Sequence, residues 1–150
     1  MTLSPIEQNE LLGEIAKTLI DAAPPNWQRL IFDFMAIGKH VSVGMGAALD
    51  NGVRQQVPAP RELAKPLGKL RHGMYAEGLG TWYSMDMVID RPDRYHVRYN
   101  RDSEPPFQTP PAPDQYTLDL ERYPRTPENT PDWFQAKLPA AFVSERHQRE

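Results

Sequence analysis

Three aspartates are the residues of this sequence whose spacing could support acid–base catalysis. Asp86 and Asp90 share one face of a run with period-two alternation, and Asp102 follows shortly after that run. Two neighbouring carboxylates can act as general acid and base, but only where burial raises the pKa of one of them. An exposed strand face beside a turn offers no such burial. We therefore expect no catalysis, and keep an enzyme with a sparse acidic site at Asp86, Asp90 and Asp102 as an alternative.

Other signatures of catalysis, metal binding or cofactor binding are missing from the sequence. It has no cysteine, and its four histidines fall on four separate predicted elements: His40, His72, His96 and His147. The glycine pairs at residues 44–46 and 78–80 lack the third glycine of a dinucleotide fingerprint, and the second pair precedes a strand where the fingerprint needs a helix. We interpret both pairs as turns, bulges or points of close approach. We expect no metal, no cofactor and no small-molecule substrate.

Composition describes an ordinary globular chain. Its 150 residues are 39% hydrophobic and 25% charged, with a formal charge of −3, and this length suits one domain with a sizeable core. The acidic balance argues against nucleic acid as a partner, which would favour a basic face. A local basic cluster is interpreted as the solvated face of a helix: Lys65, Lys69, Arg71 and His72. Without a long apolar run or a secretory signal, the sequence indicates a cytoplasmic protein with no membrane contact.

The stretch of residues 80–99 predicts a β-hairpin. Met85, Met87 and Ile89 alternate with polar residues, the same alternation resumes around Val97, and a turn at residues 91–93 separates the two runs. Period-two alternation places one set of side chains on a core face and the other on an exposed face. This hairpin therefore predicts a half-exposed antiparallel sheet.

The remaining patterns place helices and strands around this hairpin. Ser4-Pro5-Ile6-Glu7 predicts a helix start with a capping box, followed by an apolar stripe from Ile6 to Ile20. The other predicted elements are strands at residues 27–37, 41–45 and 53–57, a helix at 65–78, a proline-rich loop at 103–113, a short helix at 114–123 and a last helix starting at 131.

Together these patterns predict an α+β fold. An antiparallel meander of about five strands is packed by N-terminal, central and C-terminal helices. One domain spans residues 1–143, with a frayed tail at 144–150. We expect four residues in its core: Phe32, Phe34, Leu70 and Trp82.

The order of these features resembles the YezG-like family of immunity proteins, the antitoxins of polymorphic bacterial toxin systems. The resemblance covers roughly residues 10–138 and rests on spaced aromatic, proline and acidic positions. These are Pro25-Asn26-Trp27, Leu70-Arg71, Gly80-Thr81-Trp82, Tyr99-Asn100-Arg101-Asp102, Glu104-Pro105-Pro106, Tyr116, Asp119-Leu120, Tyr123-Pro124-Arg125 and Pro131-Asp132-Trp133. Two departures are Asn100, where Asp is more usual, and the long proline-rich loop.

The resemblance implies a non-enzymatic protein that stays in the producing cell and binds a cognate toxin domain, a DNase, an RNase or an NAD-degrading enzyme. A tight inhibitor needs a rigid patch with aromatic or charged anchors. We predict that patch within residues 102–121, with six candidates: Asp102, Glu104, Phe107, Asp114, Tyr116 and Asp119. The alternatives are that this loop only covers a sheet edge, that the exposed hairpin face is the interface, or that the protein is an adaptor module for another partner.

Overall fold

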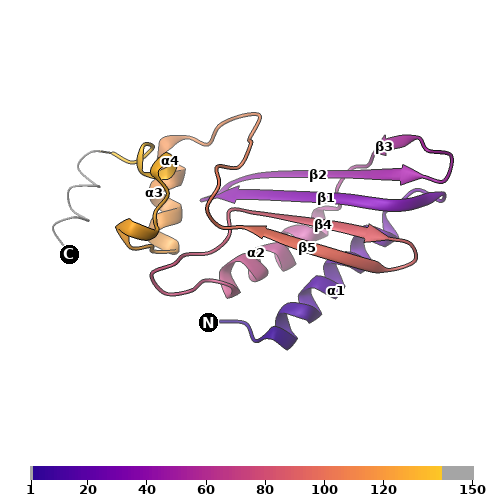
Figure 1. The fold of residues 1–150 in the computed structure, drawn as a ribbon, viewed down its shortest axis with the longest axis horizontal. Helices are drawn as coiled ribbons and strands as arrows, with labels where there is room; N and C mark the ends of the chain where they lie inside the picture. The colour runs from indigo at the N-terminus through magenta and orange to yellow at the C-terminus, as the bar shows by residue number, and fades with distance from the viewer. Residues whose placement is uncertain (1, 140–150) are drawn as a thin grey trace.

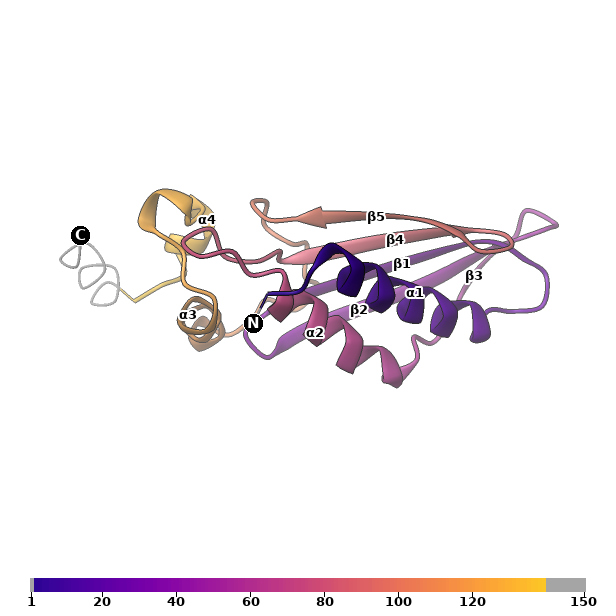
Figure 2. The same cartoon turned by 90° about the horizontal axis from the view of Figure 1, so that it is seen from below.

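A computed structural model describes residues 2–139 of the chain. Its elements are α1 (Pro5–Asp21), β1 (Trp27–Ile37), β2 (His40–Leu49), β3 (Arg54–Gln56), a 3₁₀ turn η1 (Arg61–Leu63), α2 (Ala64–Gly73), β4 (Ser84–Asp90), β5 (Arg94–Asn100), α3 (Pro113–Arg122), a second 3₁₀ turn η2 (Pro127–Asn129) and α4 (Asp132–Gln135). The strands form one antiparallel sheet in the order β3-β2-β1-β4-β5 (Figure 1), which confirms the predicted α+β class. Helices α1 and α2 pack on one face of this sheet (Figure 2).

Helix α1 begins where the capping signal predicts. The Glu7 backbone N–H donates to the Ser4 hydroxyl at 3.2 Å, and the Ser4 N–H donates to the Glu7 carboxylate at 3.0 Å. This reciprocal pair is a complete capping box. The helix then buries four residues against the sheet: Leu12, Ile15, Ala16 and Leu19. Ile6 is 71% exposed, so the buried stripe begins only after the first turn.

Strand β1 is the centre of the sheet, because it pairs with β2 on one side and with β4 on the other. Its alternate residues Leu30, Phe32, Phe34 and Ala36 face the helices and are all buried. Met85, Met87 and Ile89 of β4 extend the same core face, as the hairpin pattern predicts. The four expected core residues, Phe32, Phe34, Leu70 and Trp82, are all buried, which confirms the predicted strand register.

Helix α2 ends at Gly73 rather than at residue 78, so the predicted C-terminal boundary is wrong. The chain leaves the helix there and makes a tight turn, in which Ala76 and Gly80 exchange backbone hydrogen bonds of 3.0 and 2.9 Å. Gly78 and Gly80 have φ of 78° and 80°, a left-handed conformation that glycine adopts without steric cost. The apolar spacing that continues past Gly73 therefore belongs to a turn.

The C-terminal elements α3, η2 and α4 pack at one end of the sheet (Figure 1). They bury a second, smaller cluster: Ile37, Tyr83, Tyr116, Leu120, Phe134 and Leu138. Rings in this cluster meet closely, with Tyr83 stacked on Phe134 at 5.7 Å between centroids. The predicted tail at residues 144–150 and the predicted domain boundary at 143 lie outside the described residues. Within residues 2–139, no helix is both long and apolar enough to cross a membrane.

Candidate functional site

The sheet face opposite α1 and α2 is the open face, since no described helix packs on it (Figure 2). One row of residues crosses four strands there, because Asp33 is paired with Gly44 and with Asp86, and Asp86 is paired with Arg98. The row nearer the C-terminal elements carries Ser42, Met35, Ser84 and Asn100. These two rows carry mostly polar and charged residues, whereas Ile31 on the same face is apolar and 38% exposed.

The proline-rich segment forms a wall at one end of the open face. Pro106 and Gln108 enclose a hollow of about 560 Å³ with the sheet, whose floor includes Asp33, Asp86 and Ser84. A second hollow of about 330 Å³ lies toward β3 and shares Asp33 with the first. We call the two hollows together the open-face groove.

Asp33 lies at the centre of the open-face groove and was not among the candidates from the sequence. A Cβ atom at residue 44 would lie 2.6 Å from Asp33 Oδ1, so the glycine at this position leaves room for the carboxylate. This bears out the predicted close approach at Gly44. Burial, reinforced by the neighbouring Asp86 carboxylate, raises the pKa of Asp33 above its ordinary value.

Asp86 and Asp90 do not form the carboxylate pair that their spacing allows. The Asp90 Oδ1 atom accepts a hydrogen bond from Arg29 Nε at 2.7 Å, and this bond holds the pKa of Asp90 below its ordinary value. Asp86 instead faces Asp33 across β1 and β4, and Arg98 Nη2 approaches its carboxylate at 3.7 Å. The close carboxylate neighbours on this face are therefore Asp33 and Asp86.

Replacing Asp33 with asparagine is expected to stabilise the fold at pH 7. A raised folded-state pKa means that ionising Asp33 costs more in the folded than in the unfolded chain. The stability gained by Asp33→Asn is present above the raised pKa, shrinks as pH falls through it, and is gone below the unfolded pKa of about 3.9. Because solvent reaches and screens this carboxylate, the gain stays below about 1 kcal/mol.

Urea unfolding of the Asp33→Asn variant at pH 7 and at pH 4 measures this effect. Asp90→Asn is the matched control on the same face. It removes the negative charge that Arg29 stabilises, while its amide oxygen can still accept the hydrogen bond, so it gives no gain at pH 7. A gain from Asp33→Asn that is equal at both pH values would contradict the assigned cause.

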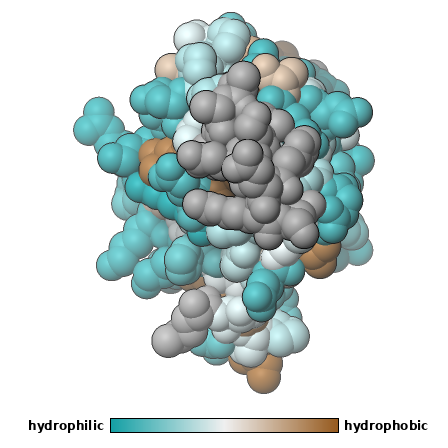
Figure 3. All heavy atoms as spheres, turned by 90° about the vertical axis from the view of Figure 1, so that its left-hand side faces the viewer, coloured by the Kyte–Doolittle hydropathy of each residue, from teal (hydrophilic) through white to brown (hydrophobic). Residues whose placement is uncertain are grey.

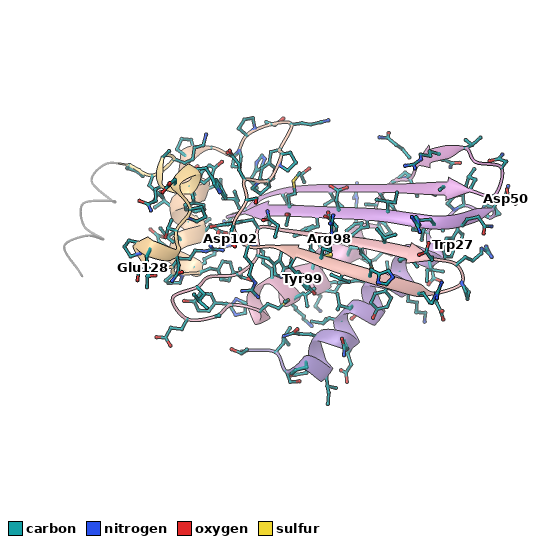
Figure 4. The ribbon with its side chains drawn as sticks, viewed as in Figure 1. Trp27, Asp50, Arg98, Tyr99, Asp102 and Glu128 are labelled. Carbon is teal, nitrogen blue, oxygen red and sulfur yellow. The ribbon has the colours of Figure 1, made fainter. Side chains whose placement is uncertain are left out.

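The acidic candidates before and at the start of α3 are accessible. Asp102, Glu104 and Asp114 are exposed, and Phe107 is half-buried. Figure 4 places Asp102 where β5 gives way to the C-terminal elements, and Figure 3 views the molecule from that end. The coloured part of the surface in Figure 3 is mostly hydrophilic. Four of the six predicted contact residues are therefore available to a partner.

Tyr116 and Asp119 are buried, so the prediction that both belong to an exposed contact patch is wrong. Their exposed fractions are 3% and 4%. Asp119 forms a buried ion pair with Arg71, with Nη1–Oδ1 and Nη2–Oδ2 distances of 2.7 and 3.1 Å. The Gly38 backbone N–H also donates to Asp119 Oδ1 at 2.9 Å. Through these hydrogen bonds Asp119 links α3 to α2 and to the β1–β2 turn.

Arg71 also departs from the sequence interpretation, which placed it on the solvated face of a helix. It is 5% exposed, its Nε donates to the Trp82 carbonyl at 2.8 Å, and its guanidinium lies 4.9 Å from the Tyr123 ring centroid. The exposed members of the predicted basic cluster are Lys65, Lys69 and His72. Helical spacing alone did not separate Arg71 from these neighbours.

Arg125 is a second buried arginine that joins the C-terminal elements to the sheet. Its Nη2 donates to the carbonyls of Thr81 and Arg101 at 2.7 and 2.9 Å, and its guanidinium lies 4.5 Å from the Tyr83 ring centroid. Burial raises the pKa of the Tyr83 hydroxyl, which has no hydrogen-bond partner among the described residues. The two arginines explain why the C-terminal elements are positioned firmly beside the groove.

The proline-rich segment is held at its start and near its middle. The Asn100 side chain donates to the Ser103 carbonyl and accepts from the Asp102 and Ser103 N–H groups, and Trp133 Nε1 donates to the Asp102 carbonyl at 2.8 Å. Further along, the Phe107 ring meets His40 with centroids 5.0 Å apart. The segment therefore covers the start of β2, and it also keeps exposed carboxylates at a fixed place.

The described residues contain no group of three or more histidine, aspartate or glutamate side chains placed to hold a metal ion. His40, His72 and His96 lie on separate elements, and the predicted position of His147 is outside the described residues. No protein-family model matches the chain, and no curated protein is similar to it.

Proposed function

We propose that this protein is an immunity protein that binds a cognate toxin domain in the cytoplasm of the producing cell and blocks its active site. The assignment to this class rests on the resemblance of spaced motifs in the sequence. The observation that carries the binding mode is the anchored proline-rich segment, which holds Asp102 and Glu104 exposed beside the open-face groove.

A preformed surface favours tight binding. Prolines and the Asn100 and Trp133 hydrogen bonds limit the motion of the segment, so little conformational entropy is lost when a partner docks on it. A toxin that acts on nucleic acid or NAD needs an electropositive cleft for its negatively charged substrate. Carboxylates of Asp102, Glu104 and Asp114 complement such a cleft and occupy the place of the substrate.

The second candidate function is a non-enzymatic adaptor that binds a different protein through the same surface. The open-face groove suits this function equally, since it presents both polar and apolar groups rather than one reactive centre. A neighbouring gene for a large secretion-linked protein with a variable C-terminal domain distinguishes the two. The presence of such a gene favours the immunity protein, and its absence favours the adaptor.

Reversing three charges tests the proposed surface. The triple variant Asp102→Lys, Glu104→Lys and Asp114→Lys is expected to weaken binding to the toxin domain at least about a hundredfold, mainly through slower association at low salt. Affinity and survival of toxin-producing cells are measured together. A second triple variant, Asp21→Lys, Asp50→Lys and Glu62→Lys, changes the net charge equally at exposed positions elsewhere.

The control variant keeps wild-type affinity under this proposal, and Figure 4 shows that Asp50 lies at the opposite end of the sheet from Asp102. Circular dichroism and urea unfolding verify that both triple variants are folded. Unchanged affinity and full protection by the Asp102, Glu104 and Asp114 variant would move the interface away from this segment.

A further inference from the structure

Strand β5 is a long, regular edge of the sheet. It has β4 on one side and no described strand on the other, whereas the opposite edge strand β3 has only three residues. The β4–β5 register is continuous from Asp90↔Arg94 to Ser84↔Asn100, so no bulge bends the strand away, and β5 contains no proline. An edge of this kind is open to pairing with a further strand.

Two backbone hydrogen bonds show which groups of β5 are free. Ala36 N–H donates to the Tyr83 carbonyl and Arg91 N–H donates to the Gln28 carbonyl, so odd-numbered residues of β4 direct their backbone groups toward β1. Even-numbered residues of β4 then bond to β5, through pairs such as Asp86↔Arg98. The N–H and C=O groups of three β5 residues therefore point outward, and no described residue bonds to them: Tyr95, Val97 and Tyr99.

The side chains that β5 itself presents on the open face are basic, and their cross-strand neighbours on β4 include Asp86 and Asp90. Arg94, His96 and Arg98 lie on the open face of β5 and are exposed, and 86% of the Arg98 side chain is accessible. These side chains stand away from the plane of the sheet, so they do not obstruct the outward backbone groups. Figure 4 shows Arg98 and Tyr99 on opposite sides of β5. The edge therefore combines free backbone groups with a row of basic side chains.

We infer that β5 is a docking edge for an extended, acidic segment of a partner protein, which adds a sixth strand to the sheet. Backbone hydrogen bonds to residues 95, 97 and 99 would supply affinity, and carboxylates at alternate positions would face Arg94, His96 and Arg98. A second copy of this chain fits poorly. If two copies of β5 paired antiparallel about Val97, Arg98 of each copy would lie opposite His96 of the other. Arg94 and Arg98 of both copies would then crowd on one face, and like charges on opposed strands are destabilising.

This inference rests on the proposed function, because it specifies one edge at which the toxin domain docks. Its test uses no toxin, so the two can fail separately. The probe is the peptide acetyl-Thr-Glu-Thr-Glu-Thr-Glu-Thr-amide, with the lysine-for-glutamate peptide as the control ligand. Titration of the ¹⁵N-labelled protein at low salt is expected to shift and protect the amides of Tyr95, Val97 and Tyr99 with the acidic peptide only.

Two variants at one position test the backbone pairing. Proline at residue 97 removes an outward N–H while leaving the ladder to β4 complete, so Val97→Pro is expected to weaken peptide binding at least about tenfold. Val97→Thr keeps the N–H group and the β-branched shape, and its affinity stays near that of the wild type. The dispersion of amide signals verifies that both variants are folded.

A charge swap tests the same edge without altering the backbone. Arg94→Glu with Arg98→Glu is expected to reverse the preference, so that the lysine peptide binds and the acidic peptide does not. Lys65→Glu with Lys69→Glu, on the exposed side of α2, leaves the preference unchanged. Three results would overturn the inference: no amide shift with millimolar acidic peptide, equal binding of both peptides, or a wild-type dimer that Val97→Pro dissociates.

Discussion

Replacing Arg71 with methionine is expected to lower the free energy of unfolding by about 3–5 kcal/mol. The side chains of Arg71 and Asp119 are only 6% and 5% exposed, so removing one partner leaves the other charge buried without compensation. The Trp82 carbonyl also loses its donor. Since folded domains are stable by about 5–15 kcal/mol, this variant loses a large share of the total. Urea unfolding measures the loss.

The double variant Arg71→Met with Asp119→Leu is the control for this prediction. It removes both charges together, and well-packed apolar residues often replace a buried ion pair at little cost. The double variant is therefore expected to be less destabilised than the sum of the two single variants, although the Gly38 N–H still loses its acceptor. Additive losses, or a loss below about 1 kcal/mol for Arg71→Met, would contradict the role of this ion pair.

Truncating Phe34 to alanine is expected to cost about 3–5 kcal/mol of the free energy of unfolding. Phe34 is 6% exposed at the centre of the sheet, and its ring meets Trp82 edge-on with centroids 5.9 Å apart. Alanine would lose this contact and leave a cavity between the sheet and the helices. Thermal or denaturant unfolding gives the change.

Ile31 provides the matched control on the same strand. It is 38% exposed, and strand alternation directs its side chain to the open face, so Ile31→Ala is expected to cost less than about 1 kcal/mol. The two variants together test the strand register. Equal losses from Phe34→Ala and Ile31→Ala would mean that the faces of β1 are not distinguished as described.

The parts of the fold that the sequence predicts well depend on local signals. The capping box at Ser4 and Glu7, the alternation in β1 and the β4–β5 hairpin all arise from residues close together in the chain. The end of α2 was predicted wrongly, because Met74 continues the helical apolar spacing while the chain has already turned. The spacing of apolar residues does not reveal the tight turn between Ala76 and Gly80.

The candidate surface was predicted less completely, because its residues meet through long-range pairing. Asp33 reaches Asp86 only through the β1–β4 register, which no local pattern determines. Arg71 and Asp119 are 48 residues apart in sequence, so an arginine and an aspartate that each look exposed on a helix are in fact paired and buried. Asp102, Glu104 and Asp114 were placed on the surface by the proline-rich composition around them, and there they are found.

We propose that a partner contacts two regions whose exposed side chains differ in charge. The proline-rich segment and the start of α3 present carboxylates, whereas the edge strand β5 presents Arg94, His96 and Arg98. A single toxin domain that covers both regions needs a basic cleft next to an acidic extended segment. This requirement is a criterion for recognising the cognate domain among candidates.

The proposed neutralisation by binding is tested by titrating a candidate toxin domain with the purified protein while measuring the activity of that domain. Toxin activity is expected to fall to zero at a ratio of about one to one, and the variant with lysine at positions 102, 104 and 114 is expected to require a large excess to reach the same inhibition. Full toxin activity in the presence of excess wild-type protein, with no complex on size-exclusion chromatography, would contradict it.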